Sequence, residues 1–239
     1  MSNKIIIAGH SHTAALVGPS GDRDNVCLLP VTGYDRIFGL HGPLTAEGYP
    51  IRTDDYWSML ARYAPGNSIA LLYAGNEQNW NFLFEVSTRF DFVLHRRPSL
   101  PLETDAVIVP ETLVRTELHH LVGSALGHVL TYLKAQPDSR VAVVGPPPPK
   151  GDHERLKRLI PPEYPDLVLT PALMRLKLWH VLQEIYQEEA MIHDAEFISP
   201  PDTVKDETGF LRPEFWAPDL THANEDYGRL MLSRLAQQL

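Results

Sequence analysis

The chain has 239 residues, of which 44% are hydrophobic and 21% are charged, and its formal net charge at pH 7 is −9. This length suits one large α/β domain and the composition is ordinary for a globular protein, so we expect a single domain over residues 1–239. The acidic balance excludes a non-specific nucleic-acid surface, because such a surface needs clustered Lys and Arg, and the run His95-Arg96-Arg97 is too short to provide one.

The sequence predicts a cytoplasmic protein without a membrane span. No segment approaches the roughly 20 consecutive apolar residues that cross a bilayer. The apolar stretch after Lys4 ends at Gly9-His10, which is too early for the hydrophobic region of a signal peptide. Cys27 is the only cysteine, so an intramolecular disulfide is impossible and nothing suggests an oxidising compartment. The oligomeric state cannot be predicted from the sequence.

Short apolar runs alternate with helical patterns along the whole chain. The runs that are typical of buried strands are residues 5–8, 26–31, 69–74, 106–109, 141–144 and 196–198. Alternation of this kind predicts a parallel sheet that is covered by helices on both faces and connected by right-handed crossovers. Prolines 146–149 indicate a stiff surface loop after the fifth run.

Apolar spacing and capping residues predict four helices. They are residues 54–64, residues 111–134, a helix with Thr170 as its cap and Pro171 in its first position, and residues 223–237. Residues 78–105 fit the alternation less well. Their aromatic side chains alternate as in a strand, but the segment could equally be an insertion over the functional site.

The N-terminal stretch places a serine where α/β sheets bind their ligands. The β-branched run over residues 5–8 ends at Gly9, and the small residues after His12 suit the first turn of a helix. Ser11 therefore lies at the carboxyl end of the first strand and beside a helix N-terminus. Open α/β sheets bind ligands there, and free backbone N–H groups there can hold an anion. We interpret Ser11 as a nucleophile.

Two other segments carry the partners that a nucleophilic serine needs. The run over residues 69–74 leads into Asn76, and Asp219 and His222 lie three residues apart just before the last helix. Histidine has the pKa to take the serine proton, and a carboxylate can hold the imidazole in one tautomer. N–H groups of Ser11, of the Asn76 side chain and of a glycine could stabilise the oxyanion that forms when an ester is attacked.

These residues resemble the sequence blocks of the SGNH hydrolases, which are also called GDSL esterases and lipases. The matching segments, in the family's order, are Gly9-His10-Ser11 for Gly-Asp-Ser, Ala74-Gly75-Asn76-Glu77 for Gly-x-Asn-Asp, and Asp219-Leu220-Thr221-His222 for Asp-x-x-His. The resemblance implies a three-layer α/β/α, flavodoxin-like fold with a central, mainly parallel five-stranded sheet. It also implies Ser11 as nucleophile, His222 as base, Asp219 as its orienter and Asn76 in the oxyanion hole.

The sequence departs from the family pattern at several points. His10 stands where the family has aspartate, and Ala74 stands where its third block has glycine. The glycine that donates an oxyanion N–H is not marked by a clear motif. Gly33 is the first choice for it, with Gly39 and Gly42 as alternatives.

The function predicted from these residues is hydrolysis of an ester, or transfer of its acyl group, through an acyl-enzyme on Ser11. The family resemblance implies a short-chain acyl ester or an O-acetylated sugar as the commonest kind of substrate, and the residues do not choose between them. The mechanism needs no cofactor or metal. A binding protein on the same fold is one alternative. A second is a metal-dependent phosphoesterase, for which the loosely matching residues are His10, His12, Asp35, Asn76 and His222.

Overall fold

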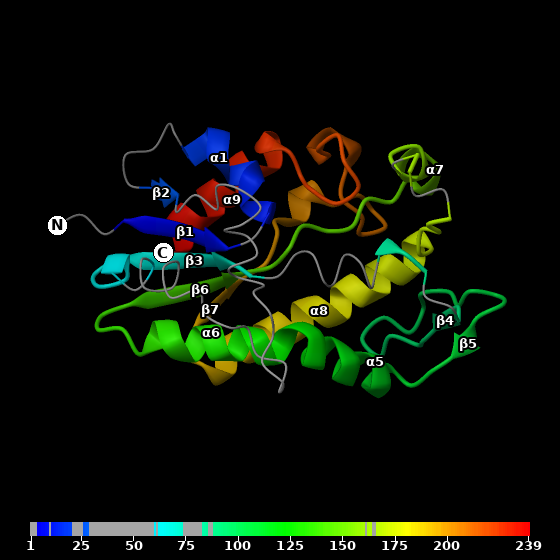
Figure 1. The fold of residues 1–239 in the computed structure, drawn as a ribbon, viewed down its shortest axis with the longest axis horizontal. Helices are drawn as coiled ribbons and strands as arrows, with labels where there is room; N and C mark the ends of the chain where they lie inside the picture. Colours follow the sequence, from blue (N-terminus) through cyan, green and yellow to red (C-terminus); the bar gives the residue numbers. More distant parts are fainter. Residues whose placement is uncertain are drawn as a thin grey trace.

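The structure, a computed structural model, describes residues 4–9, 11–20, 26–28, 60, 62–73, 83–85, 88–160, 162–163 and 166–239. At its centre lies a parallel five-stranded sheet in the order β2-β1-β3-β6-β7 (Figure 1). The strands are β1 (Ile5–Gly9), β2 (Val26–Leu28), β3 (Ser68–Leu72), β6 (Arg140–Val144) and β7 (Glu196–Ile198). This is the flavodoxin-like order, in which the winding reverses between β1 and β3.

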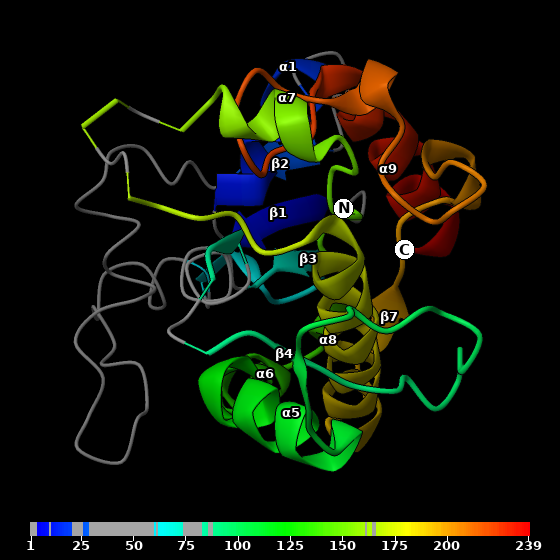
Figure 2. The same ribbon diagram turned by 90° about the vertical axis from the view of Figure 1, so that its right-hand side faces the viewer.

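Helices cover both faces of the sheet, which gives three layers (Figure 2). The main helices are α1 (Ala14–Ser20) and α9 (Glu225–Gln238) on one face, and α5 (Glu111–Leu118), α6 (Ser124–Lys134) and α8 (Ala172–Ile192) on the other. Ile5 and Ile7 of β1 pack in the core with α1 and α9, whereas Ile6 and Ala8 pack in the core with α6 and α8. Burial on both faces explains the continuous apolar run. The predicted fold class is confirmed.

The helices follow the sequence pattern, with local differences. The predicted helix over residues 111–134 is interrupted by a π-helical turn at His119–Gly123. The third helix begins at Ala172 with Pro171 as its N-cap, so the prediction that Thr170 caps it was wrong. Pro171 has an extended ψ of 142°, which keeps it outside the helix. In the predicted helix over residues 54–64, the described residues 60, 62 and 63 are helical.

Two segments differ from the prediction in the sheet that they join or in their burial. The run over residues 106–109 contributes β5 (Val107–Ile108), which pairs with β4 (Phe90–Asp91) in a separate two-stranded sheet, and its two residues are exposed. Residues 146–148 are buried, so the prediction of a surface loop was wrong there.

The shorter helices are η1 (Ser11–Thr13), α7 (His153–Lys157), η3 (Asp202–Val204) and η4 (Pro213–Phe215). Among the described helices, none has the length and apolar character needed to cross a bilayer.

Candidate active site

The first strand ends at a position where a side chain would not fit. Gly9 has φ of 135°, and a Cβ atom there would lie 2.1 Å from the carbonyl oxygen of Leu72 in β3. The chain then turns into η1, which Ser11 begins and which leads directly into α1. Ser11 therefore lies beyond the carboxyl end of β1, where the sheet order reverses and where α/β sheets bind ligands.

Asp219 and His222 lie in a short loop whose two ends are joined by backbone contacts. Trp216 and Ala223 form an antiparallel bridge, and the N–H of Ala217 donates to the carbonyl of His222 at 3.1 Å. Directly after this loop, α9 begins. The backbone thus holds both ends of a short loop together, which limits how far Asp219 and His222 can separate.

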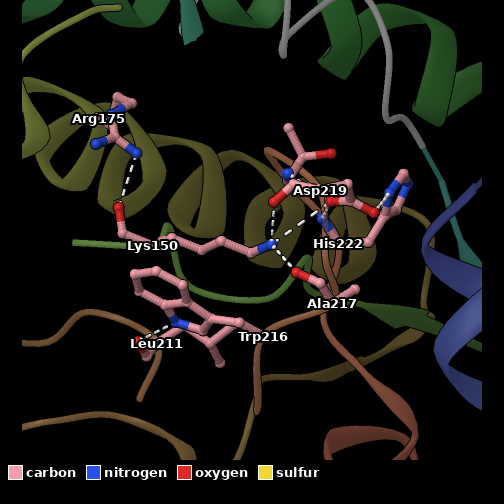
Figure 3. A network of polar contacts seen from close by, with 8 residues as sticks. Lys150, Arg175, Leu211, Trp216, Ala217, Asp219 and His222 are labelled. Carbon is pink, nitrogen blue, oxygen red and sulfur yellow. Dashed lines mark hydrogen bonds and ion pairs between the residues drawn. The ribbon is translucent and has the colours of Figure 1, made fainter. Parts of the chain in front are cut away.

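Asp219 fixes the orientation of the His222 imidazole (Figure 3). Its Oδ2 lies 2.9 Å from His222 Nδ1, and its Oδ1 accepts hydrogen bonds from the backbone N–H groups of Thr221 at 2.8 Å and His222 at 2.7 Å. Burial alone would raise the pKa of Asp219, but these hydrogen bonds hold it well below its ordinary value. An ionised Asp219 favours the tautomer in which Nδ1 carries the proton and Nε2 is free to accept one.

His12 brings the Ser11 segment against the Asp219–His222 loop. Its ring packs edge-to-face on the ring of His222, with centroids 5.3 Å apart. The Oγ of Ser11 and the Nε2 of His222 are both buried, and neither has a hydrogen-bond partner in the described part of the chain. They are therefore not bonded to each other in this structure. Catalytic hydrogen bonds are often long or misaligned without substrate, so this geometry is compatible with a serine and its base.

His12 itself is held in the neutral form. Burial is the largest cause, and together with the positive charges of His222 and Lys150 it lowers the pKa of His12 to about 3, although Asp219 acts in the opposite direction. At neutral pH the ring beside His222 is therefore uncharged. A neutral ring there adds no repulsion when His222 takes up a proton.

Lys150 is a site residue that the sequence analysis missed. It is 1% exposed, and its Nζ donates to the carbonyl oxygens of Ala217 at 2.9 Å and Asp219 at 2.6 Å. Its side chain extends along the ring of Trp216 to reach the loop (Figure 3). The only signal in the sequence was its place in the segment after β6, at the same sheet edge as Ser11.

A cleft adjoins this site. His12 and Thr221 form part of its wall, which places it beside the candidate catalytic residues. The other lining residues are Leu83, Pro146, Pro147, Pro148, Pro149, Lys150, Arg175, Trp179, Leu182 and Leu220. The wall is therefore mainly apolar, with two cationic side chains.

Several predicted site residues lie outside the described residues. They are the oxyanion-hole candidates Asn76 and Gly33, the alternatives Gly39 and Gly42, the divergent positions His10 and Ala74, and Asp35 of the metal hypothesis. Within the described ranges, no group of three or more His, Cys, Asp or Glu side chains is placed to hold a metal ion.

No protein-family model matches the chain, and no curated protein matches it. Solved structures, in contrast, match it along nearly its whole length. An aryl esterase of M. smegmatis has a TM-score of 0.52 at 14% identity, covering 99% of this chain and 98% of its own. The periplasmic domain of a lipopolysaccharide acetyltransferase from Salmonella ser. Paratyphi A has a TM-score of 0.51 at 12% identity, covering 99% of this chain and 84% of its own.

The chain has the SGNH hydrolase fold. In this fold the described site residues lie at the carboxyl edge of the sheet, where the sequence analysis expected them.

Proposed function

We propose that this chain is a serine esterase of the SGNH hydrolase type that works through an acyl-enzyme on Ser11. The observation that carries the proposal is the 2.9 Å contact between Asp219 Oδ2 and His222 Nδ1. This contact orients the imidazole and leaves its Nε2 buried and unpartnered in the described part of the chain, beside the segment that carries Ser11. A fold shared with an aryl esterase supports the same conclusion.

In the proposed mechanism, Ser11 Oγ attacks the ester carbonyl carbon while His222 Nε2 removes the hydroxyl proton. Asp219 stabilises the imidazolium that results. The oxyanion accepts hydrogen bonds from the N–H of Ser11 and, as predicted from the sequence, from Asn76 and Gly33. Each such donor contributes about 3 kcal/mol to transition-state stabilisation. His222 then protonates the leaving alcohol, and a water molecule activated by His222 releases the acid and restores Ser11.

The serine and the imidazole must meet for this mechanism to operate. Neither Ser11 Oγ nor His222 Nε2 has a partner among the described residues, so no described hydrogen bond has to break when they approach. We expect the hydrogen bond to form when an ester occupies the cleft next to His12.

Water is the acyl acceptor that we favour, and a short-chain acyl ester or an O-acetylated saccharide is the expected substrate. The shared fold of a lipopolysaccharide acetyltransferase domain makes transfer to another alcohol the second candidate. Both reactions use the same acyl-enzyme, so they differ only in the group that attacks it. Analysis of the products with and without added saccharide distinguishes them.

The test is hydrolysis of p-nitrophenyl acetate by the wild type and matched variants. Ser11→Ala and His222→Gln should each lose roughly 10³-fold or more in kcat. Asp219→Asn should lose about 10²- to 10⁴-fold, because the amide still accepts at Oδ1 but no longer stabilises the imidazolium. His120→Gln, an exposed histidine, should keep full activity.

Two results would contradict the proposal. A folded wild type that cleaves none of a panel of acyl esters would favour a binding protein on this fold. Activity that disappears in a metal chelator and returns with added metal would favour the metal-dependent alternative.

A further inference from the structure

Arg175 places a buried guanidinium in the wall of the cleft. This α8 residue is 5% exposed, and its Nε and Nη1 donate to the carbonyl oxygens of Thr170 at 3.1 Å and Lys150 at 2.8 Å. Its Nη2 is also buried, but it has no hydrogen-bond partner in the described part of the chain. A buried charged donor without an acceptor is costly, so the Nη2 group is a site where an acceptor from outside would be stabilised.

The charge on the described wall of the cleft has one sign. Lys150 and Arg175 are cationic, and none of the described lining residues is a carboxylate. Arg175 forms no ion pair with any described residue, and burial lowers its pKa only to about 10, so it stays charged at neutral pH. The Nζ of Lys150 donates to two carbonyl oxygens and lies 3.5 Å from Asp219 Oδ1, so Asp219 partly balances its charge, whereas Arg175 has no carboxylate partner in the described part of the chain.

We propose that the cleft binds a carboxylate group of the substrate and that Arg175 Nη2 is its partner. This inference rests on the proposed esterase function, since it places the carboxylate in the same molecule as the scissile ester. One free guanidinium nitrogen suits a monoanion. A phosphate dianion would need more donors than Arg175 has left.

Lys150 connects Arg175 to the loop that carries Asp219 and His222. Its carbonyl oxygen accepts from Arg175, whereas its Nζ, at the far end of the extended side chain, donates to Asp219 (Figure 3). The two ends of Lys150 therefore contact Arg175 and the loop that carries Asp219 and His222. A substrate that spans them has its carboxylate several bonds from the ester, as across a benzene ring.

The kinetic test compares esters that differ only in this charge. The pairs are 4-acetoxybenzoate with its methyl ester, and the 4-nitrophenyl monoester of terephthalic acid with its methyl ester, so that the carboxylate lies on the alcohol side or on the acyl side. In the wild type we expect kcat/KM to favour the carboxylate at least tenfold in one pair. The preference should disappear in Arg175→Met, persist in part in Arg175→Lys, and be unchanged in Arg229→Met, which removes an exposed arginine.

A binding measurement on the wild type keeps the inference testable if Arg175→Met does not fold or if no ester is cleaved. Calorimetric titration should show 4-hydroxybenzoate binding at least tenfold more tightly than 4-hydroxybenzamide, its neutral isostere. An active esterase that shows neither the kinetic nor the binding preference overturns the carboxylate site and leaves the proposed function intact. Preferential binding of the benzoate without ester cleavage supports the site and contradicts the proposed function.

Discussion

His12 shows how one buried side chain can link the candidate site to the stability of the protein. Its pKa is lowered from 6.5 to about 3 in the folded state, first by burial and then by His222 and Lys150. Between these two pH values the unfolded chain binds a proton that the folded chain does not bind. The free energy of unfolding therefore falls as the pH decreases from 6.5 to 3.

We expect His12 to account for a loss of about 2 kcal/mol in unfolding free energy between pH 8 and pH 5. His12→Gln should remove most of that loss, whatever its effect on stability at pH 8. Urea unfolding at both pH values measures the difference. His120→Gln, which changes an exposed ring, should keep the wild-type pH dependence. Equal pH dependence in all three proteins would show that His12 is not buried as a neutral ring.

At the scale of elements, the loop that carries Asp219 and His222 depends on a lysine from a distant segment. Lys150 follows β6 in the chain, and its ammonium group donates to two carbonyl oxygens of this loop. Arg175 of α8 in turn holds the carbonyl oxygen of Lys150. The two contacts connect α8 to the loop that carries Asp219 and His222 through a single residue, so we expect Lys150 to act as a positioning residue.

Lys150→Met should lower kcat on p-nitrophenyl acetate by roughly 10- to 100-fold with a smaller change in KM, because the loop loses its support. It should also lower the free energy of unfolding by about 1–3 kcal/mol, since two carbonyl oxygens lose their donor. Lys157→Met, on α7, is the control: it should leave kcat unchanged and lower the free energy of unfolding by less than about 1 kcal/mol. A Lys150→Met enzyme with wild-type kcat would exclude the positioning role.

The elements that the sequence predicted best are those whose structure depends on residues close together in the sequence. β1 was predictable because Ile5, Ile6 and Ile7 are apolar on both faces of the strand. The pairing of Asp219 with His222 was predictable because they lie three positions apart within one loop.

The elements that escaped prediction depend on distant partners. The apolar run over residues 106–109 looks like a central strand, yet β5 pairs with β4, because periodicity does not specify the neighbouring strand. Prolines 146–148 are buried, and Trp179 of α8 donates to the carbonyl of Pro146, which composition does not reveal. Lys150 is buried because carbonyl oxygens about 70 residues away accept its hydrogen bonds, and a lone lysine gives no sign of this.

At the scale of the whole molecule, a buried ion pair connects β4 to α8. Lys177 Nζ lies 2.7 Å from Asp91 Oδ1, and the two side chains are almost completely buried. The carboxylate of Asp91 also accepts from the backbone N–H groups of Phe92 and Glu103. Removing one partner leaves the other charge buried and uncompensated.

Lys177→Met should therefore lower the free energy of unfolding by about 3–5 kcal/mol. Lys157→Met removes the exposed pair with Glu154 and should cost less than about 1 kcal/mol. Urea unfolding of both variants at pH 7 tests the contrast. Similar small losses in the two variants would show that the Asp91–Lys177 pair does not join the segment to the core.

The proposed function requires that segments about 200 residues apart form one reactive site, with Ser11 activated by His222. Labelling with a fluorophosphonate, followed by mass spectrometry of the intact protein and its peptides, tests this requirement directly. We predict one adduct, located on Ser11, that is absent from Ser11→Ala and strongly reduced in His222→Gln. A folded wild type that hydrolyses esters but carries no adduct, or carries it on another residue, would contradict the assignment of Ser11 as the nucleophile.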